Sequence, residues 1–277
     1  MYIIKTMTAD QQNIPAVLSI AGSDPSGGAG IQADLKTFMA AGVYGAAVIA
    51  ALTAQNTRGV DGAMAVPAEF VDQQVTSVLS DIRIDAIKLG MLPNSEVCSK
   101  ISGHLYGYIT VCDPVMVSTS GHRLIDDAAV EALVTRILPV SDYITPNLAE
   151  LEILYGSAPP DAEKAGRALL EKFPNLSGVV IKGGHGPENR DKVTDAFVFM
   201  QAGTVQYREE THTYVNTRNT HGTGCTFSSA LASYLARQQS PADAFSNAVK
   251  LTARLIKSSA RHCIGGGHGP LLHHLFK

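Results

Sequence analysis

The chain has 277 residues, 45% of them hydrophobic and 17% charged, which is enough apolar content for a sizeable core and excludes disorder as the main state. Its 22 basic and 25 acidic residues give a net charge of −3, without the basic excess that binds a phosphate backbone. We therefore expect no nucleic-acid partner.

The four cysteines include no CxxC pair, so neither a zinc knuckle nor a thioredoxin-type site is indicated, and they are too few for a disulfide scaffold. The longest weakly polar run, residues 40–54, is shorter than the ~20 apolar residues of a membrane span. Residues 1–14 lack a signal-peptide core and cleavage site. We expect a cytoplasmic protein without a membrane partner.

Short apolar runs alternate with helical periodicity along most of the chain. Buried strands are predicted at 17–21, 46–52, 86–89, 109–112, 143–144 and 179–181. Helices are predicted at 30–41, 68–80, 94–106, 127–137, 147–155 and 161–172. Uninterrupted apolar strands are typical of burial on both faces, and repeated strand–helix alternation predicts a three-layer α/β/α fold with a mostly parallel central sheet.

The last third of the chain follows a different pattern. Residues 193–200 and 204–210 predict an antiparallel hairpin at the sheet edge, followed by helices at 225–237 and 241–259. The tail is glycine-rich and reads as irregular. Without a Pro/Ser-rich linker or an internal repeat, we expect residues 15–277 to form a single domain after a flexible lead-in at residues 1–14.

Ligands of open α/β sheets bind at the carboxyl ends of the strands, so the loops there hold the candidate residues. In the glycine-rich turn 21–30, Gly22 and Gly27 have P-loop spacing, but Lys and Ser/Thr are missing where a P-loop needs them. The turn is therefore either purely structural or brings its backbone close to a small molecule. Asp34, one turn into the next helix, either favours the helix dipole or contacts a ligand.

Three further candidates follow predicted strands. Residues 53–57 read as a loop, where Gln55 either serves turn chemistry or pairs with the edge of a heteroaromatic ring. Asp113 caps a turn or faces the ligand crevice. Asn147 and Glu150 match a helix-capping pattern, or alternatively orient metal-bound water beside a phosphate.

The segment 219–226 carries the most information. Gly222 and Gly224 precede a helix start and expose backbone N–H groups that form an anion site. Cys225 lies where a thiol pKa tends to be lowered. The cysteine is structural, or the nucleophile of a hydrolase with His221 as its base, or adjacent to the attacking oxygen of a phosphoryl transfer.

The remaining candidates are a lysine that follows a predicted strand and three histidines of the tail. Lys182 is either a solvated loop residue or a contact to nucleotide phosphates. His268, His273 and His274 are interpreted as a solvated tail that binds no metal.

Taken in order, these segments resemble the hydroxymethylpyrimidine/phosphomethylpyrimidine kinases of thiamine biosynthesis, within the ribokinase-like superfamily. The resemblance covers roughly residues 15–275. Its motifs are AGSDPSGGAGIQADLKTF from Ala21, GVYG from Gly42, LTAQNT from Leu52, GML from Gly90, DPVMV from Asp113, TPNLAE from Thr145, KGGH from Lys182 and NTHGTGCTFS from Asn219.

The resemblance implies roles for particular residues. Those that match the pyrimidine pocket are Gly22, Asp34, Gln55, Met91 and Val115, with Asp34 and Gln55 pairing with the ring nitrogen and the exocyclic amine. Those that match the nucleotide and phosphate region are Asp113, Asn147 and Lys182, with Glu150 at Mg²⁺ through water. Those that match the catalytic region are Gly222, Thr223 and Gly224, the anion hole, and Cys225, the base, where many members of the superfamily carry Asp.

The implied reaction is ATP- and Mg²⁺-dependent phosphorylation of 4-amino-5-hydroxymethyl-2-methylpyrimidine and then of its monophosphate, by a homodimer. The alternatives are a pyridoxal/pyridoxine kinase, from which the residues at Gln55 and Asn56 differ, and a non-catalytic pyrimidine- or vitamin-binding protein. One departure concerns residues 119–122, Thr-Ser-Gly-His, where the family commonly shows Lys before Ser-Gly and then Asp. If that Lys assists a phosphate, its absence bears on the second phosphorylation.

Overall fold

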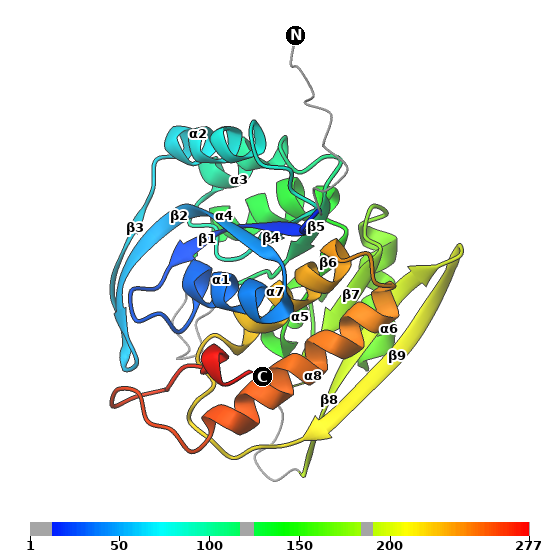
Figure 1. Ribbon diagram of the computed structural model, residues 1–277. Helices are drawn as coiled ribbons and strands as arrows, with labels where there is room; N and C mark the ends of the chain where they lie inside the picture. The colour runs from blue at the N-terminus through cyan, green and yellow to red at the C-terminus, as the bar shows by residue number, and fades with distance from the viewer. Residues whose placement is uncertain (1–12, 117–124, 184–190, 277) are drawn as a thin grey trace.

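A nine-stranded sheet forms the centre of the protein, seen in a computed structural model that describes residues 13–116, 125–183 and 191–276 (Figure 1). The strand order is β3-β2-β1-β4-β5-β6-β7-β8-β9. The strands are β1 (Ala16–Ser23), β2 (Tyr44–Asn56), β3 (Gly59–Ala65), β4 (Ala86–Leu89), β5 (Ile109–Cys112), β6 (Tyr143–Ile144), β7 (Gly178–Ile181), β8 (Lys192–Gln201) and β9 (Thr204–Thr213). The six strands from β2 to β7 in that order are parallel, and the pairings of β3, β8 and β9 are antiparallel.

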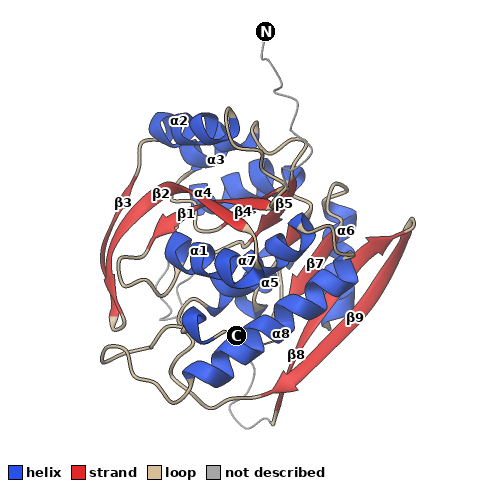
Figure 2. Cartoon of the chain, in the orientation of Figure 1, coloured by secondary structure: helices blue, strands red, loops and turns tan. Residues whose placement is uncertain are grey.

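Helices cover both faces of the sheet (Figure 2). They are α1 (Gly30–Ala41), α2 (Ala68–Leu79), α3 (Ser95–Ser102), α4 (Asp127–Ala132), α5 (Leu148–Tyr155), α6 (Ala162–Lys172), α7 (Thr223–Ala236) and α8 (Pro241–Ser259). Two hydrophobic clusters result, one with buried residues of α2 to α6 and the other with buried residues of α1, α7 and α8. The three-layer α/β/α prediction is confirmed.

Most predicted elements are observed within a few residues, and the clearest difference lies at one edge of the sheet. β2 continues to Asn56 and pairs with β3, so the predicted loop at 53–57 is largely strand. β3 escaped prediction because its sequence, GVDGAMA, is poor in strand formers and mostly exposed. Pairing with the long strand β2 supplies the hydrogen bonds that this sequence does not favour by itself.

The tail also differs from the prediction at one residue. His273 is buried, and its Nε2 lies 3.1 Å from Thr37 Oγ1 on α1 and 3.0 Å from Thr226 Oγ1 on α7. The interpretation of His273 as solvated is therefore wrong, because its ring joins two helices of the core. Burial lowers the pKa of His273 to about 4, so the ring is neutral at physiological pH.

In the part of the chain that the structure describes, no helix combines the length and the apolar character needed to cross a membrane.

Candidate active site

A cavity of ≈ 780 Å³ opens at the carboxyl ends of the parallel strands. The turn between β1 and α1, the end of β2, the start of α7 and one side of α8 enclose it. Its lining includes every predicted site residue except Asp34: Gly22, Gln55, Met91, Asp113, Val115, Asn147, Glu150, Lys182, Gly222, Thr223, Gly224 and Cys225. Strands far apart in sequence therefore deliver the predicted residues to one place.

The start of α7 depends on a glycine at its N-cap. Gly222 adopts φ 78° and ψ 10° at the N-cap, and a Cβ there would lie 1.8 Å from the carbonyl oxygen of Gly28. Glycine is thus required where this loop meets the β1–α1 turn. No side chain caps the helix, and the Thr223 N–H donates to the carbonyl oxygen of Thr220 at 3.2 Å. Among the described residues, the structure gives no acceptor for the N–H groups of Gly222 and Gly224, so an anion in the cavity can accept from them.

Asp113 and Lys182 form an ion pair beside that helix start. Lys182 Nζ lies 2.7 Å from Asp113 Oδ1, and the carboxylate also accepts from Thr145 Oγ1 at 3.0 Å and Ser228 Oγ at 3.3 Å. Burial by itself would raise the pKa of Asp113, but Lys182 and Lys88 hold it below its usual range. Burial opposes the charge of Lys182 as well, yet Asp113 and Glu150 raise its pKa. Both groups are charged at neutral pH.

Asn147 and Glu150 cap α5. Asn147 Oδ1 accepts from the Glu150 N–H, and Glu150 Oε2 accepts from the Asn147 N–H, both at 2.9 Å. The capping interpretation is confirmed. Burial, and secondarily the Asp113 carboxylate, raise the pKa of Glu150 to about 7, although Lys182 lowers it. The carboxyl group therefore changes charge near neutral pH.

The donor set suits a weakly held divalent cation. Among the described residues, no group of three or more His, Cys, Asp or Glu side chains is arranged to hold a metal ion. Mg²⁺ usually keeps several waters and binds through few protein carboxylates together with substrate phosphates. Glu150, buried in the cavity wall beside Lys182 and Asp113, fits a contact of this kind through water.

Cys225 is the third residue of α7 and is half-buried. Burial raises the pKa of its thiol to about 11, although the Lys88 ammonium opposes the shift. The predicted lowering of this pKa is wrong, because desolvation outweighs the helix N-terminus. His221 directs Nε2 to Asp24 Oδ2 at 2.8 Å, and no hydrogen bond joins it to Cys225 among the described residues. A cysteine hydrolase would therefore lack its base.

Polar side chains also gather around the end of β2, close to His221, which immediately precedes the N-cap residue of α7. Thr53 Oγ1 donates to Gln55 Oε1 at 3.1 Å, and Gln55 Nε2 lies 3.4 Å from His221 Nε2. Asp24 is buried, and although burial raises its pKa, hydrogen bonds with His221 and Ser26 produce a net lowering. Sequence reasoning missed the pairing of Asp24 with His221, since the two residues are separated by 197 positions.

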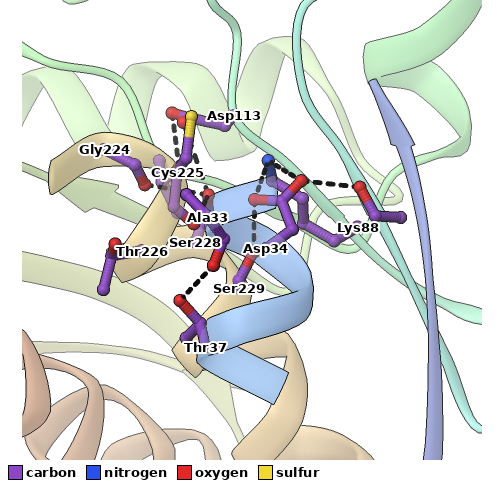
Figure 3. A network of polar contacts seen from close by, with 12 residues as sticks. Ala33, Asp34, Thr37, Lys88, Asp113, Gly224, Cys225, Thr226, Ser228 and Ser229 are labelled. Carbon is purple, nitrogen blue, oxygen red and sulfur yellow. Dashed lines mark hydrogen bonds and ion pairs between the residues drawn. The ribbon is translucent and has the colours of Figure 1, made fainter. Parts of the chain in front are cut away.

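Asp34 lies behind the cavity wall, in a network that the sequence did not reveal (Figure 3). Both of its carboxylate oxygens lie 2.9 Å from Lys88 Nζ, and Ser19 and Ser229 donate to it at 2.6 and 2.7 Å. Lys88 itself lines the cavity and was overlooked. The signal was a lysine within the apolar strand Ala86–Leu89. The direct contact of Asp34 with a pyrimidine stays a prediction.

Comparisons with known proteins identify the family of this chain. Residues 24–272 match the sequence profile of phosphomethylpyrimidine kinase. The chain is 44% identical over 264 residues to the hydroxymethylpyrimidine/phosphomethylpyrimidine kinase of Rhizobium meliloti (strain 1021), covering 92% of this chain and 96% of that protein. Among solved structures, it is similar to phosphomethylpyrimidine kinase from Clostridium difficile 630, with a TM-score of 0.73, 35% identity, and coverage of 88% of this chain and 98% of that one.

A second solved structure, pyridoxal kinase from Staphylococcus aureus in complex with AMP-PCP and pyridoxal, matches with a TM-score of 0.82 and 30% identity, covering 95% of this chain and 94% of that one. The fold and the site therefore define a kinase of the ribokinase-like class. Within that class, the chain belongs to the phosphomethylpyrimidine kinase family. The departure at residues 119–122 lies outside the described residues.

Proposed function

We propose that the protein transfers the γ-phosphoryl group of ATP to 4-amino-5-hydroxymethyl-2-methylpyrimidine and then to its monophosphate, in thiamine biosynthesis. One observation carries the proposal: the uncapped start of α7 and the Asp113–Lys182 pair line the same cavity as Gln55 and Met91. Anion binding and ring recognition are thus combined in one space. The named kinases among its relatives support the same reaction.

The charged end of the cavity suits the nucleotide phosphates. The N–H groups of Gly222 and Gly224 bind phosphoryl oxygens, and Lys182 adds a positive charge held in place by Asp113. Glu150, whose carboxylate is fixed by the Asn147 N–H, would hold Mg²⁺ through water, and the bound cation would neutralise charge on the phosphates. ATP as the donor is supported by the AMP-PCP complex of the similar pyridoxal kinase.

The pyrimidine end orients the acceptor. Gln55 offers a donor and an acceptor to the ring edge, and Met91 and Val115 contribute apolar contact. Cys225 Sγ is the candidate acceptor of the hydroxymethyl proton. Phosphoryl transfer has a loose transition state, so this proton leaves late and a base contributes little before then. In the second phosphorylation the nucleophile is a phosphate oxygen, which needs no base.

The proposal also includes an oligomeric state and a cellular location. A homodimer is supported by exposed apolar side chains on the β2–β3 edge, where Leu52 lies opposite Met64 and the two are 40% and 61% exposed. A cytoplasmic location is supported by the four unpaired cysteines. Light scattering of the purified protein tests the first property.

Phosphorylation of pyridoxal is the second candidate, favoured by the TM-score of 0.82 to the Staphylococcus aureus enzyme. Steady-state ADP release with Mg·ATP decides between the two, using the hydroxymethylpyrimidine, its monophosphate and pyridoxal in parallel. We expect kcat/KM for both pyrimidines to exceed that for pyridoxal by about 10-fold or more, since a site built to pair with polar ring atoms rejects a ring that lacks them. A preference for pyridoxal would overturn the proposal, and absence of turnover would indicate a binding protein.

A further inference from the structure

Lys88 occupies an unusual place for a lysine. It is fully buried on β4, in register with Ser19 of β1 and Val111 of β5 near the centre of the sheet. Lysine is almost never fully buried unless it is paired, because removing its charge from water is costly. Its partner is Asp34 of α1, at 2.9 Å from each carboxylate oxygen. The residue therefore needs an explanation beyond helix and sheet packing.

The carboxylate of Asp34 is saturated with donors, whereas the ammonium of Lys88 is not. Asp34 accepts from Lys88, Ser19 and Ser229, which come from β4, β1 and α7 (Figure 3). An ammonium has three N–H groups, and its two contacts with Asp34 use at most two of them. Within the described ranges, the structure gives Lys88 no other hydrogen-bond acceptor. One N–H thus remains for a group in the cavity that Lys88 lines.

Space for this ammonium is provided by the residue that follows β4. A Cβ at Gly90 would lie 2.9 Å from Lys88 Nζ, so any other residue would crowd the ammonium at the cavity wall. Geometry places this ammonium beside the first turns of α7. Ser229, four residues after Cys225 on that helix, donates to the same Asp34 Oδ1 that Lys88 Nζ contacts at 2.9 Å. Lys88 and Cys225 both line the cavity, and the charges that act on the thiol are Lys88, Asp34 and Asp113.

We propose that Lys88, held by Asp34, is the charge partner of the Cys225 thiolate and so supports removal of the hydroxyl proton in the first phosphorylation. This inference rests on the proposed function. In the step, the Cys225 thiol first gives its proton to solvent, and the Lys88 ammonium stabilises the thiolate that forms. The hydroxymethyl O–H bond then breaks and its proton moves to Cys225 Sγ. The oxygen forms a bond to the γ-phosphorus, and the bond from that phosphorus to the β,γ-bridging oxygen breaks with its electron pair leaving on ADP. The proton that Cys225 accepts restores its thiol. Lys88 and Asp34 are positioning residues, because they act through Cys225.

The reactivity of the Cys225 thiol tests its pairing with Lys88 without a kinase assay. In a Cys263→Ser background, which removes the exposed cysteine, alkylation of Cys225 by iodoacetamide is followed at pH 7.5 by peptide mass spectrometry. Lys88→Met removes the cation, so we expect alkylation to slow by about 10-fold. Asp34→Asn removes the anion, so we expect alkylation to accelerate by about 3-fold. Both variants break the same ion pair. If the pair had only a structural role, the two alkylation rates would change in the same direction, and that result would overturn the proposal.

A charge-balanced variant keeps the test decisive where the single variants fold poorly. Lys88→Met/Asp34→Asn leaves no unpaired buried charge, so we expect it to fold, as circular dichroism verifies. We expect kcat for the first phosphorylation to fall by about 10-fold or more, and by a larger factor than kcat for the second. In the Cys225→Ala background the same double change should add nothing to the loss in the first step. Equal losses in both steps would contradict the proposal.

The two hypotheses fail separately. A wild-type protein without turnover on the pyrimidine overturns the proposed function, whereas the alkylation rates still test the pairing of Lys88 with Cys225. Turnover by the wild type combined with unchanged alkylation in the Lys88 variant overturns the inference alone.

Discussion

The two proposed ends of the cavity are built on different principles. The proposed phosphoryl end consists of Lys88, Asp113, Lys182 and the start of α7, and its charges are buried and paired across several elements. The proposed pyrimidine end is centred on Gln55, on a strand whose partner β3 is mostly exposed. The phosphoryl end is fixed by the core of the sheet, whereas the pyrimidine end depends on an edge hairpin.

The glycine-rich tail holds that hairpin in place. The N–H of His268 donates to the carbonyl oxygen of Thr57 at 2.8 Å, and the N–H of Gly267 donates to Thr57 Oγ1 at 3.2 Å. A Cβ at Gly267 would lie 2.0 Å from the Thr57 carbonyl oxygen. The charged side chains are therefore held by buried ion pairs, whereas Gln55 lies on a hairpin whose position depends on contacts with the tail.

The largest effect is expected from breaking the more deeply buried ion pair. The Lys88 and Asp34 side chains are each 0% exposed, while those of Lys182 and Asp113 are 14% and 2% exposed. Lys88→Met leaves a buried carboxylate unpaired, so we expect the free energy of unfolding to fall by about 4 kcal/mol. Lys182→Met should cost about 2 kcal/mol, because the Asp113 carboxylate it leaves still has Lys88 as a nearby cation. Urea denaturation measures both, and equal losses would contradict the comparison.

Removal of the thiol separates the two reactions. We expect Cys225→Ala to lower kcat of the first phosphorylation by about 100-fold, in the range for a general base, and kcat of the second by less than about 10-fold. The reason is that a phosphate oxygen attacks without losing a proton. Coupled ADP-release assays on the two pyrimidines give the ratio, and an equal loss in both reactions would refute the role of Cys225 as a base.

Glu150 makes the charged end sensitive to pH. Its pKa is raised to about 7 in the folded protein, above the ordinary value of 4.5 that we assign to the unfolded chain. The protonated acid is thus favoured on folding, and this stability is present below pH 4.5 and lost as the pH rises through 7. We expect Glu150→Gln to increase the free energy of unfolding relative to the wild type, and to do so by about 1–2 kcal/mol more at pH 8 than at pH 5. Urea titrations at both pH values check this, and a parallel pH dependence in the variant would contradict it.

The smallest effect is expected at the pyrimidine end. Gly267→Ala pushes the tail away from Thr57, so we expect KM for the pyrimidine to rise by about 5-fold with kcat and KM for ATP unchanged. Gly59→Ala is the matched control, because a Cβ at Gly59 on the same hairpin meets no atom within 4 Å. A similar KM in both variants would show that the tail does not position the hairpin.

The sequence predicted the central strands, most helices and twelve of the residues that line the cavity, because apolar runs and strand ends define them locally. The residues that escaped prediction depend on distant partners. Lys88 is paired with Asp34, and β3 is paired with β2. The ring of His273 lies within hydrogen-bond distance of Thr37 and Thr226. The pKa of Cys225 escaped for a related reason, since burial by the folded chain outweighs the local effect of the helix start.

The protein is proposed to phosphorylate the pyrimidine twice in one active site. Mass spectrometry of a single reaction with the hydroxymethylpyrimidine, Mg·ATP and the purified protein follows the substrate, the monophosphate and the diphosphate over time. We predict that the monophosphate rises first and then falls as the diphosphate accumulates. A monophosphate that stays constant once formed would contradict the claim of two reactions, and an unchanged pyrimidine would contradict the proposed function.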